Sequence, residues 1–458
     1  MLKIYNSLTR EKQIFTPLIP KKINLYVCGV TVYDYCHIGH ARTYTTFDVI
    51  VRFLRWQGYA VTYVRNITDI DDKIIKRAAE NKESIQNLVS RFTEIMHEEF
   101  KNLNFLPPDL EPTATGAIPE IIELVQKLIQ KNFAYQAKNN DIYYRVRKFE
   151  SYGKLSGQNL ENLQIGARIL PDEDKEDALD FVLWKSAKPG EPAWESPFGL
   201  GRPGWHIECS AMSKKCLGET FDIHGGGSDL TFPHHENEIA QSVAANDCDF
   251  ARYWIHSGMV QINDEKMSKS LGNFFIIRDV LKEYPAEIIR YFLTSSHYRT
   301  QINYSKENLD NAKASLTRLY TALLGVKRSE KLKPSEFTQR FITAMEDDFN
   351  VPEAIAVLFD MARELNKLKN IDLIQAGLLA KELLALGNIL GLLNSDPEKF
   401  LQGGNNSQED FAIQVLIHER AEAKKSKDFA RADQIRKNLL DQGIILEDSP
   451  SGTTWRKN

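Results

Sequence analysis

The sequence predicts an α/β protein with a doubly wound parallel sheet, an inserted connective domain and a helical C-terminal half. Three observations lead to this fold class. An apolar run at 25–27 passes through a polar turn into an amphipathic helix, and an alternating strand pattern follows at Tyr59–Arg65. Turn-rich Gly and Pro segments at 116–200 interrupt this pattern, and strand and helix signals return at 204–244. Helical periodicity then dominates residues 311–393, so a helical bundle is expected after the sheet.

The composition is that of an ordinary protein of several domains. The chain has 458 residues, of which 26% are charged, and its net charge is -4. Two to four domains are expected, and any nucleic-acid contact must use local basic patches. The sequence shows no signal-peptide pattern and no apolar segment long enough to span a bilayer, which predicts a cytoplasmic protein without membrane contact. Its five cysteines are then expected to be thiols.

The first strand-to-helix turn, Cys28–His40, carries the most chemistry. It reads Cys-Gly-Val-Thr-Val-Tyr-Asp-Tyr-Cys-His-Ile-Gly-His. Gly39 allows a ligand to approach the backbone closely, and His37 and His40 place two imidazoles beside the free N–H groups of the helix start. The turn therefore predicts a phosphate site, although so short a motif also arises through packing or chance.

The segment after the second strand, Asn66–Lys73, is rich in aspartate. A hard-metal site would need several oxygen ligands in fixed geometry, so an acidic helix start is the better interpretation. Thr68, at the carboxyl end of the strand, is expected to line the cleft. Residues Ile74–Phe105 are predicted to be helical.

The inserted segment is predicted to contain a helix at Ile118–Lys131 and a strand pair near Ile142–Val146. The insertion is small for a separate hydrolytic editing domain. The active site of the sheet domain is therefore expected to discriminate between substrates without a second, editing site. The predicted divisions are the first half of a Rossmann-type domain at 1–115, the connective insertion at 116–200, the second half at 201–260, a loop and stem-contact region at 261–310, the helical bundle at 311–395 and a C-terminal domain at 405–458.

Four residues of types that bind soft metals are expected near the cleft. His234 and Glu238 are four apart at a helix start and face the same way. Cys28 ends the first core strand, and Cys209 lies where the chain returns to the sheet, so a parallel sheet could bring both thiols to one edge. Two thiolates, an imidazole and a carboxylate would favour zinc. Spacing alone leaves this ligand set open.

A second signature lies far downstream at Lys266–Ser270, which reads Lys-Met-Ser-Lys-Ser in a segment predicted to be an exposed loop. Together with His37-Ile38-Gly39-His40, it resembles the two signatures of class I aminoacyl-tRNA synthetases, in the same order. The resemblance implies four catalytic groups that stabilise the phosphates of ATP: His37, His40, Lys266 and Lys269.

Within class I, three blocks resemble the cysteinyl-tRNA synthetases over nearly the whole chain. They are the Cys28 turn, Trp-His-Ile-Glu-Cys ending at Cys209, and Pro-His-His-Glu-Asn-Glu ending at Glu238. The resemblance implies one zinc ion per chain, held by Cys28, Cys209, His234 and Glu238. It also implies an amino-acid pocket formed by Gly29, Thr68, Trp205 and His224.

The resemblance further implies a two-step reaction. L-cysteine would react with ATP, accompanied by Mg2+, to give cysteinyl adenylate and pyrophosphate, and cysteine would then pass to the 3'-terminal adenosine of tRNA(Cys). Zinc would select the thiolate, because apolar pockets separate near-isosteres by only about 10²-fold. A plain tight turn at 225–229 is the alternative to a nucleotide contact there. The residues expected to contact ATP are Gly39, Gly225, Gly227, Asp229 and Lys269.

The segment Lys424–Lys437 is locally basic and is followed by Trp-Arg-Lys at 455–457. A charge run is commonly a solvated face, but in a chain with this resemblance it is interpreted as part of an anticodon-binding domain. The chain is expected to act as a monomer. The buried stripe of the segment is predicted to be Phe429, Ala432, Ile435 and Leu439.

Two other functions stay open. A ligase that forms the same cysteine adenylate but transfers cysteine to a small amine would lack a full anticodon module, so residues 405–458 weigh against it. A non-catalytic RNA-binding relative that keeps zinc for its structure would have no chemical use for the two signatures.

Overall fold

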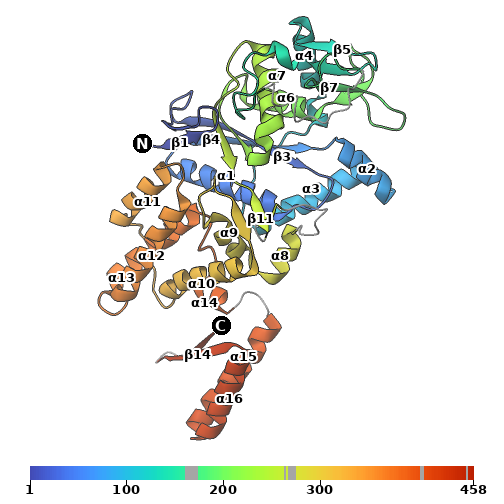
Figure 1. Cartoon of the computed structure of the whole chain (residues 1–458). Coiled ribbons are helices and arrows are strands. Elements are labelled where there is room, and N and C mark those ends of the chain that lie inside the picture. The colour runs from blue at the N-terminus through green and yellow to red at the C-terminus, as the bar shows by residue number, and fades with distance from the viewer. Residues whose placement is uncertain (160–173, 263–264, 267–274, 403–406, 450–451, 458) are drawn as a thin grey trace. The chain divides into compact units, whose positions relative to one another are not determined.

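The chain folds into two compact units. The computed structural model describes residues 1–159, 174–262, 265–266, 275–402, 407–449 and 452–457 (Figure 1). The first unit comprises Met1–Ala286, Leu293–Ser305 and Thr343–Pro352. The second comprises Glu287–Phe292, Lys306–Ile342 and Glu353–Asn458.

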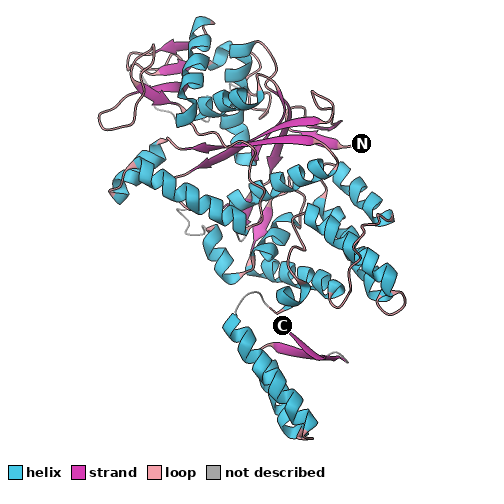
Figure 2. Cartoon of the chain, turned by 180° about the vertical axis from the view of Figure 1, so that it is seen from behind, coloured by secondary structure: helices cyan, strands magenta, loops and turns pink. Residues whose placement is uncertain are grey.

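A four-stranded parallel sheet in the order β10-β9-β3-β4 forms the centre of the first unit. Its strands are β3 (Lys22–Thr31), β4 (Ala60–Thr68), β9 (Phe221–Gly227) and β10 (Ala251–Ser257). The β3–β9 pair joins the segments that precede and follow the insertion. Helices lie on both faces of this sheet (Figure 2). The predicted doubly wound parallel sheet is confirmed.

Helix α1 (Ile38–Trp56) crosses from β3 to β4 and buries most of its side chains. His37 is its N-cap residue, and the His37 ring accepts a hydrogen bond from the Gly39 N–H. At the other end, Gly58 has a φ of 82°, which a residue with a side chain adopts only at a cost. The phosphate turn predicted from the sequence is therefore a capped helix start at the carboxyl edge of the sheet.

The predicted helical run Ile74–Phe105 is two helices rather than one. Helix α2 (Asp72–Asn81) ends at Lys82, whose φ of 55° is left-handed, and α3 (Ile85–Asn102) begins after Ser84. The Ser84 hydroxyl accepts the Asn87 N–H and caps α3. At the start of α2, the Asp71 carboxylate accepts the Lys73 N–H, as expected for an acidic helix start.

The insertion consists of helix α4 and an antiparallel sheet in the order β5-β6-β7-β8. The predicted helix and strand pair are present, but β6 ends at Tyr144 and a 3-10 turn, η2 (Val146–Lys148), follows it. The bounds are η1 (Thr115–Ala117), α4 (Ile118–Gln130), β5 (Ala134–Gln136), β6 (Ile142–Tyr144), β7 (Phe181–Ser186) and β8 (Gly201–Pro203).

The chain then returns to the main sheet through elements that surround β9. Helices α6 and α7 pack against each other and against the insertion in one apolar core. The bounds are α6 (Trp205–Leu217), η3 (Ser228–Leu230), η4 (Thr231–His235) and α7 (Glu236–Asn246).

Small elements complete the first unit. Strands β1 (Lys3–Asn6) and β2 (Glu11–Ile14) form a hairpin, and β12-β11-β13 form a three-stranded sheet. Helix α9 (Ala286–Thr294) contributes residues to both units. The remaining bounds are β11 (Val260–Ile262), β12 (Glu265–Lys266), α8 (Ile277–Glu283) and β13 (Ile302–Tyr304).

The second unit is mainly helical, as predicted. No helix among the described residues has the length and apolar character needed to cross a membrane. Residues 403–406, Gly-Gly-Asn-Asn, are predicted from their composition to form a linker and lie outside the described residues. The bounds are α10 (Lys306–Leu323), α11 (Glu336–Glu346), α12 (Val351–Leu368), α13 (Leu373–Ile389), α14 (Pro397–Leu401), α15 (Ser407–Lys425) and α16 (Phe429–Asp441).

The C-terminal end differs from two expectations from the sequence, namely a short tail from Gly443 to Asn458 after a helix pair and a buried stripe that includes Phe429. The last residues form a hairpin, β14 (Ile444–Ser449) and β15 (Gly452–Lys457), whose Trp455 packs in a core with α15 and α16. Of the predicted stripe, Ala432, Ile435 and Leu439 are buried, but Phe429 is 63% exposed. The assignment of Phe429 to the stripe was wrong, because this residue lies in the first turn of α16, outside the contact with the hairpin core.

Candidate active site

Four different elements bring the predicted metal ligands together. Cys28 lies in β3, Cys209 in α6, His234 in η4 and Glu238 in α7. All four side chains are buried, and their ligand atoms lie within 4.8 Å of one another. The fold therefore makes one compact donor set from residues that are scattered along the chain.

The spacing of these donor atoms fits a tetrahedral metal ion. Cys28 Sγ lies 3.8 Å from Cys209 Sγ and 3.5 Å from Glu238 Oε1. Two sulfurs about 2.3 Å from one zinc ion would be about 3.8 Å apart, and a sulfur and an oxygen about 3.5 Å apart. His234 Nε2 lies 3.1 Å from Glu238 Oε1, close to the spacing of about 3.3 Å expected for nitrogen and oxygen ligands. The residues therefore fit zinc.

The charges in this cluster also suit a cation. Cys28 donates a hydrogen bond to Cys209, which lowers the pKa of the Cys209 thiol to about 6. Burial would raise the pKa of Glu238, but His224 and His234 hold it well below its usual range. Glu238 Oε2 is buried, and it lies 3.4 Å from His224 Nε2. Two negative charges shielded from water are costly unless a cation compensates them.

A second donor set shares Cys28 and Glu238 with the first. His224 and His235 complete it, and its ligand atoms also lie within 4.8 Å of one another. His235 Nε2 is 4.0 Å from Glu238 Oε1, longer than the spacing expected for one ion, and His235 Nδ1 lies 2.8 Å from His256 Nε2. The first set is therefore the better match. His235 was not predicted as a donor, because its neighbour His234 alone has the i, i+4 spacing to Glu238.

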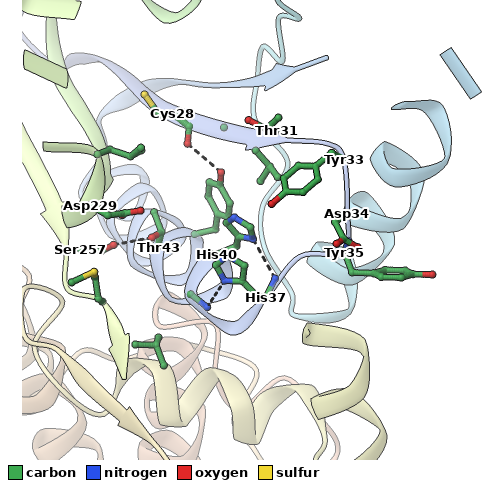
Figure 3. Close-up of a pocket in the computed structure, with 18 of the residues that line it drawn as sticks. Cys28, Thr31, Tyr33, Asp34, Tyr35, His37, His40, Thr43, Asp229 and Ser257 are labelled. Atoms are coloured by element: carbon green, nitrogen blue, oxygen red, sulfur yellow. Dashed lines mark hydrogen bonds between the residues drawn. The ribbon is translucent and has the colours of Figure 1, made fainter. Parts of the chain in front are cut away.

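The two histidines of the first signature lie at the entrance to α1. His37 Nδ1 accepts the Gly39 N–H at 3.1 Å, and His40 Nδ1 accepts the His37 N–H at 3.2 Å (Figure 3). With both Nδ1 atoms accepting, a neutral ring carries its proton on Nε2 and can donate it. The rings stack with centroids 3.7 Å apart and line a cavity of about 390 Å³, within the usual range for small-molecule sites.

Gly29 lies in the wall of this cavity beside Asn66. The Gly29 N–H donates to Asn66 Oδ1 at 2.7 Å, and a Cβ at Gly29 would lie 1.5 Å from the Asn66 carbonyl oxygen. A side chain at this position would therefore displace β4. Asn66 was not predicted as a site residue; its place at the end of β4, beside the end of β3, is the sequence signal that could have identified it.

The other three residues predicted for the amino-acid pocket lie at different depths. Trp205 is 38% exposed, lines the cavity and lies 4.2 Å from the His234 ring, centroid to centroid. His224 is fully buried, with its Nε2 3.5 Å from Cys28 Sγ and its ring stacked on Trp254. Thr68 is buried, and its hydroxyl donates to Glu208 at 3.1 Å. Trp205 thus lines the cavity, whereas His224 and Thr68 lie behind its lining residues.

The residues predicted to contact ATP at the end of β9 and just after it divide in the same way. Gly227 and Asp229 line the cavity. Gly225 is a buried residue of β9, and a Cβ there would lie 2.2 Å from the Phe47 ring of α1. Packing of α1 on the sheet therefore explains Gly225.

The second signature lies largely outside the described residues. Lys266 is the last residue of β12 and pairs with Gln261 of β11, and strand β11 begins with Val260, which lines the cavity. The rest of the signature, including Lys269, lies outside the described residues.

Comparisons with known proteins decide the family. The family of class I (C) tRNA synthetase catalytic domains matches residues 14–314. Cysteine--tRNA ligases of Thioalkalivibrio sulfidiphilus and of Haemophilus influenzae strain 86-028NP are 59% and 60% identical to this chain, over 100% of each sequence. The chain belongs to the cysteine--tRNA ligase family.

Two further matches cover the C-terminal half of this cysteine--tRNA ligase family member. A DALR domain matches residues 340–394, and a cysteinyl-tRNA ligase anticodon binding domain matches residues 410–456. Among solved structures, a Mycobacterium tuberculosis methionyl-tRNA synthetase bound by methionyl-adenylate matches with a TM-score of 0.60 and 15% identity, over 85% of this chain and 96% of that chain. A putative arginyl-tRNA synthetase from Campylobacter jejuni matches with a TM-score of 0.56 and 13% identity, over 83% of this chain and 95% of that chain. These structures show the shared fold.

Proposed function

We propose that this chain activates L-cysteine with ATP and transfers it to tRNA(Cys). The observation that carries the proposal is the position of the donor set. Cys28 belongs to this buried set and also lines the cavity that His37 and His40 line. A group that would select the thiol and groups that would bind phosphate therefore lie in one site. Membership of the cysteine--tRNA ligase family supports the same reaction.

Zinc is the metal that we propose for the site, held by Cys28, Cys209, His234 and Glu238. Two sulfurs, one nitrogen and one oxygen favour zinc over calcium or magnesium, which prefer oxygen donors. When bound, zinc would supply a soft Lewis acid that accepts a thiolate in preference to a hydroxyl. Such a contact would reject serine, from which cysteine differs by a single atom and which an apolar pocket would exclude poorly.

The chain's own residues would position the amino acid. Gly29 and Trp205 line the cavity, so we assign them direct contact with cysteine. Thr68 is buried against Glu208, and His224 is buried against Cys28. These two residues would hold the lining of the pocket in place without touching cysteine. This arrangement would place the cysteine carboxylate toward α1, where its partner ATP would bind.

The first step would join a carboxylate oxygen of cysteine to the α-phosphorus of ATP as pyrophosphate leaves. No general base is needed because the carboxylate is already ionised. His37 and His40 would donate to the phosphates through Nε2, with Lys266 and Lys269 on the pyrophosphate and Mg2+ accompanying ATP. Gly39 would allow close approach of the phosphates, and Gly227 and Asp229, which line the same cavity, would contact the ribose and adenine. Gly225 would contribute only by keeping α1 close to β9.

In the second step, a hydroxyl of the 3'-terminal adenosine would attack the adenylate carbonyl, and AMP would leave. We assign recognition of the tRNA body to the C-terminal half, with residues 405–458 as the anticodon-binding domain. We further propose that the chain acts as a monomer. We also propose that it is cytoplasmic, because five free thiols suit a reducing compartment. The predicted divisions at 1–115, 116–200, 201–260, 261–310 and 311–395 stay as proposals for the remaining domains.

The decisive experiment is amino-acid-dependent ATP–pyrophosphate exchange with cysteine, serine and methionine. It is run on the purified chain, on chain stripped of metal, and on stripped chain reloaded with zinc, with bound metal measured in each sample. Exchange with cysteine alone that follows zinc content is expected. Equal exchange with serine would contradict thiol selection, and no exchange by folded, zinc-loaded chain would favour a non-catalytic relative.

Aminoacylation of tRNA(Cys) distinguishes the proposed function from the remaining alternative. A ligase that uses a small amine would exchange pyrophosphate with cysteine but would leave tRNA(Cys) uncharged. Formation of cysteinyl-tRNA at a rate comparable to exchange is the expected result.

A further inference from the structure

One wall of the active-site cavity has no role in the reaction described so far. The sheet order β10-β9-β3-β4 places β9 and β4 on opposite sides of β3. On the β9 side, Gly227 and Asp229 line the cavity and serve ATP in the proposed reaction. On the other side, the residues that line it are Thr31 at the end of β3, Tyr33, Asp34 and Tyr35 after β3, and Lys73 at the start of α2.

Tyr33 and Lys73 form a pair in this wall. The Lys73 ammonium lies 5.6 Å from the centre of the Tyr33 ring. Figure 3 shows the Tyr33 ring across the cavity from Asp229 and Ser257. Lys73 is exposed, and among the described residues no carboxylate pairs with its ammonium, whereas Asp34 lies 3.5 Å from Arg77. The wall therefore presents an aromatic ring with a positive charge over one of its faces, and that charge has no carboxylate partner among the described residues.

An aromatic ring beside an ammonium group is a combination that binds a nucleotide. The ring stacks on a base, and the cation pairs with a phosphate. In the proposed function, ATP binds at the β9 side and at the start of α1, and cysteine binds beside Cys28. A second nucleotide is nevertheless required in the reaction, because the acceptor is the terminal adenosine of an RNA.

We propose that Tyr33 and Lys73 hold the 3'-terminal nucleotide of the tRNA, with the base on the Tyr33 ring and a backbone phosphate at Lys73. This inference rests on the proposed function and adds the acceptor subsite to it. In this position the acceptor hydroxyl would add to the adenylate carbonyl carbon, the bond from that carbon to the AMP phosphate oxygen would break, and the hydroxyl proton would leave with AMP. The two residues position the acceptor and take no part in bond making.

The test compares the two steps in Tyr33→Ala and Lys73→Met, using the full chain and intact tRNA. The first step is measured by pyrophosphate exchange, and the second by single-turnover transfer from preformed adenylate. We expect Tyr33→Ala to slow transfer about 10- to 100-fold, the range for loss of one stacked base, and to reduce exchange less than about threefold. Lys73→Met should weaken tRNA affinity and make it less sensitive to salt.

Two control variants separate stacking from general damage. Tyr33→Phe keeps the ring and should transfer cysteine within about twofold of the unchanged chain. Lys76→Met removes a charge on the next turn of α2, where the side chain is 79% exposed, and should leave transfer unaltered. Exchange activity itself reports whether each variant is folded.

Three results would overturn the acceptor subsite. Equal losses in exchange and transfer would place Tyr33 in the adenylate pocket. Normal transfer by Tyr33→Ala would show that Tyr33 has no role in transfer. Loss of transfer in Tyr33→Phe would show that the Tyr33 hydroxyl matters, and not stacking on the ring. Absence of exchange in the unchanged chain would contradict the proposed function itself, which keeps the two failures distinct.

Discussion

In the catalytic unit, the charged groups that carry the chemistry are buried against one another, whereas in the C-terminal domain, residues 407–457, they lie at the surface in ion pairs. Cys209 and Glu238 are shielded from water. Glu419, by contrast, is 44% exposed and pairs with Arg431, which is 50% exposed. Removal of one buried charge leaves its partners uncompensated, while an exposed pair contributes little. Single changes should therefore have large effects on the cavity floor and small effects in the C-terminal domain.

The largest effect is expected for Cys209→Ser. Serine is a poor zinc ligand, so the donor set would lose one of its two sulfurs. We expect bound zinc to fall and cysteine-dependent exchange to drop about 10³-fold. Zinc content and exchange are measured on the same samples.

Cys216→Ser is the matched control, because this half-buried cysteine lies on the same helix and belongs to neither donor set. It should keep its zinc and its exchange rate. Normal exchange by metal-free Cys209→Ser would contradict the metal-based selection of cysteine.

A smaller effect is expected at the start of α1, where His40 Nδ1 caps the helix and, in the proposed function, His40 Nε2 donates to phosphate. His40→Asn can keep the acceptor for the His37 N–H but loses the Nε2 donor, whereas His40→Gln can keep a donor and loses the cap. We expect the maximal exchange rate to fall about 10²-fold in His40→Asn and less in His40→Gln, with cysteine affinity little changed in either. The opposite order would assign His40 to helix capping.

In the C-terminal domain, Phe429 is exposed, so its ring could stack on a base if this domain binds tRNA as proposed. Phe429→Ala removes no buried contact, so stability should be unchanged, while loss of stacking should raise KM for tRNA about 10-fold without altering exchange. Leu440→Ala, 55% exposed on the same helix, is the control and should have no effect. A rise in exchange KM for cysteine or ATP in Phe429→Ala would contradict the separation of the two regions.

The smallest expected effect concerns stability and pH, at Glu99 of α3. Glu99 is 3% exposed, neither carboxylate oxygen has a hydrogen-bond partner in the described structure, and burial raises its pKa to about 7. An unfolded chain loses this proton near pH 4.3, so between about pH 4.3 and 7 the folded state binds more protons and its stability falls as pH rises.

Glu99→Gln removes this penalty while keeping the shape of the side chain. The variant should be more stable than the unchanged chain by about 1–3 kcal/mol at pH 8, and equally stable near pH 4. Thermal unfolding at a series of pH values measures the difference. A difference that is constant with pH would show that the Glu99 carboxyl does not titrate in this range.

The sequence by itself determined the local features of this protein. His37, Gly39 and His40 lie at a helix start because capping and glycine chemistry act over a few residues. His234 and Glu238 approach each other because four residues make about one helical turn. The parallel sheet follows from the order of strand and helix patterns. The joining of Cys28 and Cys209 in the prediction depended on family resemblance, since no spacing rule links positions so far apart.

Only the tertiary structure decided which residues face the cavity. Gly225 and Gly227 are two residues apart in one strand, yet Gly225 packs against Phe47 and Gly227 lines the site. Phe429 satisfies the helical spacing of its stripe but lies outside the core of its domain. Tyr33 and Lys73 meet because β3 and β4 end side by side. Periodicity determines the direction of a side chain relative to its own element, whereas packing between elements determines what the side chain meets.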